Sequence, residues 1–267
     1  EKRYQRGRQA IARALDLDPD LSVAHHIYTY FQVEEGEARE AMSRLLERAR
    51  LRDNDPQVYA GLVPALRFCG LLEASTAAHD RARRLDPSVR TGVCYTYYAM
   101  GEWEKAIETD DETPKYCRFL SLDRMGRLDD AGDSLRSEIA RGFEGWEAVA
   151  VRMTLAAMEL DREQVRRLWD RMAEASFRDP EGTYFMMRNL ARVGEVDLAL
   201  ELLERVVKRG FHCAASIEGD PWLELLRTEP EFYEQVDEAR RGGAAAEGEF
   251  HRLGGGETLG LPGAALR

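Results

Sequence analysis

Apolar residues recur along this chain at the three- and four-residue spacing that places them on one face of a helix. The pattern predicts paired helices, of which residues 56–68 and 71–85 form the clearest pair, with Gly70 at the turn between them. Residues 2–17 show the same helical spacing before the first pair. The sequence therefore predicts an all-α protein built from helix hairpins.

The hairpins repeat with a period of 34 residues. Most of the predicted turns carry a glycine, namely Gly36, Gly70, Gly101, Gly126 and Gly194. Gly36 and Gly70 are one period apart, and Leu160 stands midway between the last two glycines, which are separated by two periods. A fixed period of this length indicates a repeat protein.

Two further sets of positions agree with this period. Five residues after each turn comes a small or modest side chain (Ala41, Ser75, Ala106, Ala131, Val165 and Ala199), and four residues later a mostly large one (Leu45, His79, Asp110, Leu135, Trp169 and Leu203). The small residue lets the second helix approach the first, and the large one fills the space between neighbouring hairpins. Because a single hairpin cannot bury its apolar face, we expect only the stack to be stable.

The hairpin that ends at Pro87 resembles the tetratricopeptide repeat. The matching residues are Tyr59, Leu62 and Leu66 in the first helix, then Ser75, Ala82 and Pro87. The resemblance covers residues 2–209, and we assign residues 1–209 to a repeat array. It implies a right-handed α-solenoid whose first helices line a concave groove for a peptide or a partner helix.

The array is irregular over residues 101–126. Gly101 and Gly126 are only 25 residues apart, so the second helix of this hairpin, over residues 102–110, is predicted to be short. The acidic loop TDDETP follows it. We therefore expect a kink around residues 108–115.

The chain leaves the period after residue 209. Residues 210–240 predict two short capping helices, 221–228 and 230–240, each with a proline near its start, where the missing N–H is not needed. Five apolar residues offer a face that seals the end of the stack: Trp222, Leu225, Leu226, Phe232 and Val236. Residues 241–267 have eight glycines in their last 26 positions and no helical period, which predicts a flexible tail.

The capping segment carries a second resemblance. Its D-P-W-L-x-x-L-R-x-x-P-x-F motif, residues 220–232, is similar to the segment that closes tetratricopeptide arrays in bacterial multidomain regulators. In those chains the array follows a Ser/Thr kinase, a nucleotide cyclase or a DNA-binding domain. The resemblance implies an alternative function, namely the regulatory C-terminal portion of a kinase or cyclase whose catalytic domain lies upstream of residue 1.

Composition narrows the class of protein. Hydrophobic residues make up 44% of the chain and the net charge is −11, which indicates a folded protein and argues against a nucleic-acid partner. No apolar run approaches the ~18 residues that span a bilayer. The chain begins at Glu1 with a helix and no signal peptide, so we expect a cytoplasmic piece of a longer chain. The four widely spaced cysteines predict buried thiols in a reducing compartment.

No set of residues predicts catalysis, a metal or a cofactor. His25 and His26 are adjacent on a helix, so their side chains diverge by about 100°. The acidic run of residues 108–112 lacks the alternating spacing and the glycine of a calcium loop. The chain is therefore predicted to act through its surface, as a non-catalytic interaction scaffold.

The resemblance assigns the binding surface to the first helices. Mapping their inner positions gives eight residues: His26, Tyr30, Arg67, Phe68, Tyr95, Tyr98, Arg188 and Arg192. Aromatic residues and arginine are enriched at binding hot spots. The tyrosines have an equal alternative as inter-repeat packing, and the Lys and Asn set that clamps a peptide carboxylate in this family has no match here.

The expected partner is a protein, a peptide or a neighbouring domain. Arginines on the inner face favour an acidic or amphipathic peptide, whereas the overall charge favours a basic partner. Self-association is a third hypothesis, because Gly7, Ile11 and Ala14 on the N-terminal helix lack the partner helix that a repeat normally supplies.

Overall fold

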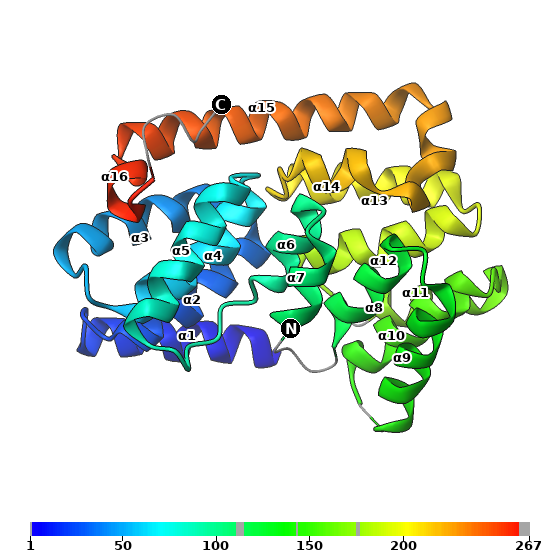
Figure 1. Ribbon diagram of the computed structural model, residues 1–267, viewed down its shortest axis with the longest axis horizontal. Helices are drawn as coiled ribbons and strands as arrows, with labels where there is room; N and C mark the ends of the chain where they lie inside the picture. The colour runs from blue at the N-terminus through cyan, green and yellow to red at the C-terminus, as the bar shows by residue number, and fades with distance from the viewer. Residues whose placement is uncertain (1, 111–114, 143, 175–176, 262–267) are drawn as a thin grey trace.

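The protein is a stack of short helices, as a computed structural model of the chain shows (Figure 1). The structure describes residues 2–110, 115–142, 144–174 and 177–261. Within these ranges sixteen α-helices and one 3₁₀ helix follow one another, and no described residue lies in a strand. The all-α prediction is confirmed.

The helices form consecutive hairpins. After α1 (Lys2–Leu17), the pairs are α2 (Ser22–Glu35) with α3 (Ala38–Leu51), α4 (Pro56–Phe68) with α5 (Leu72–Leu85), α6 (Cys94–Met100) with α7 (Trp103–Glu108), α8 (Tyr116–Arg124) with α9 (Leu128–Ala140), α10 (Trp146–Met158) with α11 (Arg162–Glu174), and α12 (Pro180–Arg192) with α13 (Val196–Lys208). The C-terminal part consists of α14 (Ala214–Gly219), the 3₁₀ helix η1 (Pro221–Thr228), α15 (Pro230–Arg252) and α16 (Gly255–Leu259). From α1 to α13, each helix packs against the next one along the chain.

The turns within the hairpins have the left-handed backbone that their glycines predict. Gly36, Gly70, Gly101, Gly126 and Gly194 all have positive φ, the largest being 90° at Gly36. Leu160 occupies the corresponding turn between α10 and α11 and also has a positive φ, of 58°. The period therefore located this turn correctly, although leucine disfavours its conformation.

The small residues predicted after each turn are all in the core. Ala41, Ser75, Ala106, Ala131, Val165 and Ala199 are each completely buried. The larger residues four positions later are mostly buried too, although His79 is half-buried and forms a hydrogen bond through Nδ1 to the hydroxyl of Thr91 at 2.8 Å. Close approach of the paired helices thus depends on small side chains at these positions.

The hairpin of α6 and α7 is short, as its spacing predicts. α6 has seven residues and α7 has six. The Asp110 carboxylate then accepts a hydrogen bond from the backbone N–H of Arg118 at 2.9 Å, in the first turn of α8. Residues 111–114 of the predicted acidic loop lie outside the described part of the chain.

The array curls back on itself, so that its last hairpin meets its first two. The backbone N–H of His212 donates to the carbonyl of Phe68 at 2.7 Å. A Cβ at Gly210 would lie only 2.8 Å from the carbonyl oxygen of Gly36. These contacts bring the end of α13 against the turns that follow α2 and α4.

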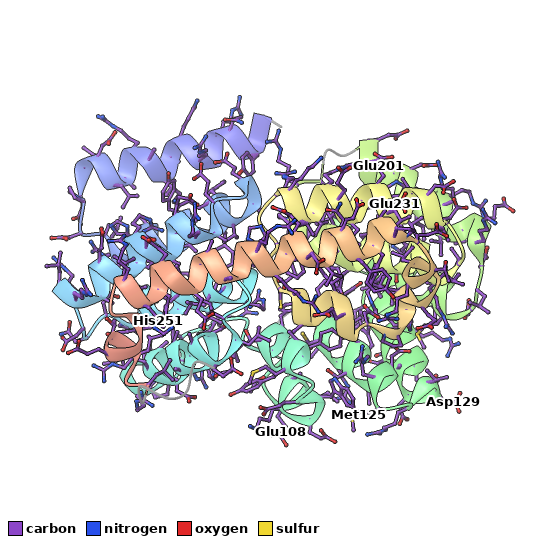
Figure 2. All side chains as sticks on the ribbon, turned by 90° about the horizontal axis from the view of Figure 1, so that it is seen from above. Glu108, Met125, Asp129, Glu201, Glu231 and His251 are labelled. Atoms are coloured by element: carbon purple, nitrogen blue, oxygen red, sulfur yellow. The ribbon has the colours of Figure 1, made fainter. Side chains whose placement is uncertain are left out.

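The predicted flexible tail is wrong for residues 241–261, which are helical and packed, while residues 262–267 lie outside the described part. α15 continues from Pro230 to Arg252, and α16 follows it. α15 crosses the molecule from α13 and α14 to α3, and Figure 2 shows it running from Glu231 at one end to His251 at the other. Ala246 and Phe250 in α15 and Leu259 in α16 are buried.

The glycines of α15 explain why composition predicted a flexible tail where the chain is helical. A Cβ at Gly242 would lie 2.4 Å from the imidazole ring of His212, and one at Gly243 would lie 3.3 Å from the carbonyl oxygen of Cys69. Glycine at these positions lets α15 lie close to the backbone beneath it. The same residues raise the glycine content that had indicated a disordered chain.

The N-terminal helix has a partner in α2. Gly7 faces the ring of Phe31, 3.2 Å from where its Cβ would be, and Tyr4 packs edge-on against the same ring. Gly7, Ile11 and Ala14 are each half-buried. The self-association hypothesis assumed that this face lacks a partner helix, and for Gly7 that assumption is wrong.

Candidate functional site

A cavity of about 370 Å³ lies on the inner side of the hairpins. Its lining residues come from α2, α4, α6, α8, α10 and α12, which are the first helices of the six hairpins, and from the segments just before α6 and α12. No second helix of a hairpin contributes a described residue to this lining. The volume is within the range of ordinary ligand pockets.

Aromatic side chains make up much of the lining. They are Tyr30, Phe68, Tyr95, Tyr116, Trp146 and Phe185. The ring of Phe185 has its centroid 5.8 Å from that of Tyr95 and 5.4 Å from that of Tyr116. Tyr30 and Trp146 are 43% and 45% exposed, so they lie where the cavity meets solvent.

Arg67 and Glu181 form a buried ion pair in the wall of the cavity. Nε and Nη2 of Arg67 donate to the two carboxylate oxygens of Glu181 at 2.7 and 2.8 Å. Burial works against the charge of Arg67, yet the Glu181 carboxylate raises its pKa above the ordinary value. The guanidinium also lies 5.4 Å from the centre of the Tyr95 ring. The pair links α4 to α12, and it neutralises the one arginine among the described lining residues.

Three further carboxylates line the cavity and have no ion pair with any described residue. They are Glu34, Glu147 and Asp179, and each is half-buried. Asp179 caps α12 by accepting a hydrogen bond from the N–H of Glu181 at 3.0 Å. Burial and then the negative charges of Glu181 and Glu34 raise the pKa of Asp179 to about 7. Burial also raises the pKa of Glu34. The lining thus has an excess of negative charge.

Four of the eight predicted groove residues line this cavity, namely Tyr30, Arg67, Phe68 and Tyr95. His26 lies beside them, with its ring centroid 5.5 Å from that of Tyr30 and its Nδ1 2.7 Å from Oε1 of Gln57. Predicted residues from α2, α4 and α6 thus lie together around this cavity.

The other predicted residues lie elsewhere. Arg188 is completely buried, and its Nε donates to the Asp220 carboxylate at 2.6 Å. Tyr98 is buried, whereas Arg192 is exposed beside the Trp222 ring, 5.6 Å from its centre. η1 packs against α12 and covers the face that carries Arg188. A groove residue at Arg188 is thus a wrong prediction, and so is a basic inner face.

The ion pair of Arg188 gives the D-P-W-L motif a structural role. Although burial alone raises the pKa of Asp220, Arg188 and the hydrogen bonds to this carboxylate bring it below the ordinary value. Asp220 also caps η1 by accepting from the N–H of Trp222 at 3.0 Å. The Trp222 ring lies 4.2 Å from the Arg188 guanidinium.

The sequence did not predict the four carboxylates of the cavity or half of its aromatic residues, namely Tyr116, Trp146 and Phe185. One signal was present, because Glu34 is four residues after Tyr30 and therefore on the same face of α2. Glu147, Asp179 and Trp146 stand at helix starts, where helical spacing carries no information about which way a side chain points. These three became recognisable only once α10 and α12 were placed against α2 and α4.

The structure also has a hollow beside α8 and α9 and another beside α16. Within its described residues, no three His, Cys, Asp or Glu side chains come close enough to hold a metal ion together. The four cysteines are free and buried, as predicted. None of the helices in the described ranges is both long and apolar enough to pass through a membrane. The sequence matches no protein-family model, and no curated protein resembles it significantly.

Proposed function

We propose that this protein is a non-catalytic scaffold of the tetratricopeptide-repeat type, which binds a peptide or a partner helix in the cavity between its first helices. The observation that carries the proposal is the origin of the lining: all six first helices contribute to one cavity. In a stack of like hairpins the first helices share the concave side, where such proteins bind extended partners. The buried small residues after each turn support the same repeat assignment.

The chemistry of the lining also fits a binding surface. Aromatic residues at its mouth, Tyr30 and Trp146, are the kind that dominate binding energy at protein interfaces. The buried free thiols fit a reducing compartment, so the proposal includes a cytoplasmic location. The D-P-W-L motif suggested a kinase or cyclase parent. The pairing of its Asp220 with Arg188 gives the motif a structural role that does not depend on such a parent.

A photo-crosslinking experiment tests the position of the site. Peptides are first selected on the intact protein from a random display library, and Tyr30 is then replaced by p-benzoylphenylalanine. The control places the same crosslinker at Tyr233, an exposed tyrosine on α15 outside the cavity. We expect the selected peptides to crosslink at position 30 and not at position 233. Failure to select any peptide, or crosslinking at position 233 alone, would overturn the proposal.

A further inference from the structure

We propose that the cavity takes the cationic side chain of a basic peptide, so that an ammonium or guanidinium group lies between its aromatic rings and its carboxylates. This inference rests on the proposed function and specifies the chemistry of the partner. It follows from the composition of the lining, from an interaction that the protein already makes within its own wall, and from the surface next to the mouth.

The lining combines the two kinds of group that attract an organic cation. Among the described residues, six aromatic side chains and four carboxylates line the cavity, against the single guanidinium of Arg67. A cation near an aromatic face is attracted by the ring quadrupole, and more strongly where water is partly excluded. Carboxylates at short range add a charge interaction that screening weakens less inside a cavity than on the surface. An anionic side chain would meet repulsion in the same place.

Arg67 shows that this wall can hold a cation. Its guanidinium is bound by the Glu181 carboxylate and lies over the Tyr95 ring, at 5.4 Å from the ring centre. The same kinds of group also line the rest of the cavity, where the carboxylates are Asp179, Glu147 and Glu34. Arg67 pairs with Glu181 alone. Arg178 and Arg209 act on the charge of Glu34, whereas Glu147 and Asp179 have no ion pair with a described residue and can attract a cation from outside.

Without such a cation, the negative charges of these carboxylates repel one another. Glu34 and Glu181 both oppose ionisation of Asp179, and no ion pair within the described residues offsets this repulsion. A positive charge that enters the cavity interacts favourably with all of them. Binding of a cation therefore offsets part of the repulsion among these carboxylates.

The surface beside the mouth of the cavity indicates which residues of the peptide would flank its cationic side chain. Val23, Ile27 and Tyr30 are 48%, 40% and 43% exposed on one face of α2, and Glu34 continues that face into the cavity. A peptide with a basic residue next to apolar residues would cover this stripe while its charge reaches the carboxylates. The net charge of −11 also attracts a basic partner over distance.

The test compares three peptides that differ at one position. Each is a short amphipathic peptide with lysine, norleucine or acetyl-lysine at that position, and its binding to the intact protein is measured by isothermal titration calorimetry. Norleucine keeps the aliphatic chain without the ammonium group. We expect the lysine peptide to bind at least about tenfold more tightly than either analogue.

Matched protein variants locate the effect. Glu34→Gln and Glu147→Gln each remove one carboxylate charge from the lining, and Glu231→Gln removes one from the exposed start of α15. The first two should weaken the lysine peptide by about tenfold each, whereas the third should leave its affinity within about twofold. Unchanged melting temperatures confirm that the variants are folded.

A small probe separates this inference from the proposed function. Tetramethylammonium chloride is titrated against sodium chloride at equal ionic strength, and the indole N–H signal of Trp146, assigned with Trp146→Phe, is followed by NMR. A shift with tetramethylammonium alone supports the cation site even if no peptide binds. Peptides that bind equally with lysine and norleucine overturn the cation site and leave the scaffold proposal standing. Absence of any shift and of lysine preference also overturns it.

Discussion

At the scale of single residues, the buried and half-buried charged groups differ in their partners: Arg188 is paired with Asp220, whereas Asp179 has no ion pair with a described residue. The resemblance implied that Arg67 and Arg188 lie on the inner face. Arg67 lines the cavity and Arg188 does not, and each is neutralised by a buried carboxylate. Spacing identifies the face of a helix, but it does not reveal whether another element covers that face. η1 packs over Arg188 and buries it, whereas Asp179 remains half-buried at the cavity. The charges of the site were therefore not predictable before the hairpins were placed.

Asp179→Asn should make the protein more stable at neutral and alkaline pH. The carboxyl titrates near its ordinary value of 3.8 in the unfolded chain and at about 7 in the folded one. Between these values the unfolded chain releases a proton that the folded protein retains, so stability falls as pH rises and stays low above 7. Asparagine retains the cap without the charge. We expect a gain of about 2 kcal/mol at pH 8 in urea unfolding, after allowance for solvent screening.

Most of the gain should disappear near pH 3.5, where the carboxyl is mostly protonated in both states. A gain that is equal at pH 3.5 and pH 8 would show that the effect is not one of ionisation.

Replacing Arg188 should be far more damaging than replacing Arg192. Arg188→Met leaves the Asp220 carboxylate buried without its partner, which costs about 3–5 kcal/mol. Arg192→Met removes an exposed guanidinium beside the same Trp222 ring and should change the unfolding free energy by about 0.5 kcal/mol or less. Thermal melts of the two variants check this difference. Equal melting temperatures would contradict the burial of the Arg188 pair.

At the scale of elements, the sequence predicted the hairpins well and the C-terminal helix badly. The 34-residue period located the turn at Leu160 without a glycine, because the neighbouring positions kept their spacing. For α15, the glycines that permit contact with His212 lowered the helical signal of the segment. Composition describes a segment by itself, whereas α15 is helical through what it packs against.

Leu160→Gly should stabilise the turn between α10 and α11. Leu160 has φ of 58° and is 59% exposed, so its side chain contributes little packing to offset a strained backbone. We expect a gain of about 1 kcal/mol in the free energy of unfolding. Gly194→Ala is the converse control, since its turn has φ of 82° and open space around the added Cβ. The Gly194→Ala variant should lose about 1 kcal/mol of unfolding free energy. A loss of stability in both variants would contradict strain at Leu160.

Two glycine substitutions in α15 should have opposite effects. Gly242→Ala places a methyl group against the His212 ring and should cost about 1–3 kcal/mol. Gly248→Ala adds the same group where nothing lies within 4 Å, so the helix preference of alanine should give a gain of up to about 1 kcal/mol. Chemical unfolding of both variants measures the difference. A gain in both would mean that α15 does not pack on His212.

At the scale of the whole molecule, α15 and α16 hold together parts of the chain that lie far apart in the sequence. α15 contacts α13 and α14 near its start and α3 near its end, and α16 reaches α3 and α5. The repeat period predicted which neighbours pack, but it contains no information on contacts between the first and last hairpins. Those contacts depend on how the hairpins are placed relative to one another, which the period does not specify.

A chain that ends after residue 240 should be clearly less stable than the full chain. The truncation removes Phe250, Leu253 and Leu259, which are all buried, and exposes the apolar surface beneath them. We expect a loss of at least about 3 kcal/mol, visible as a lower melting temperature in circular dichroism. A flexible tail would predict no change, so an unchanged melting temperature would restore that interpretation.

The meeting of the two ends of the array has a consequence for how the chain folds. In an open repeat protein, structure spreads from any hairpin to the next, and each hairpin can unfold with little effect on distant ones. Here the hydrogen-bonded ion pair of Arg67 and Glu181 joins residues 114 positions apart. The carbonyl of Phe68 likewise gains its hydrogen bond only when His212 is in place. The early hairpins cannot complete their contacts until the last one has formed, which makes unfolding a collective event. Such long-range contacts also slow folding relative to helical proteins with local contacts only.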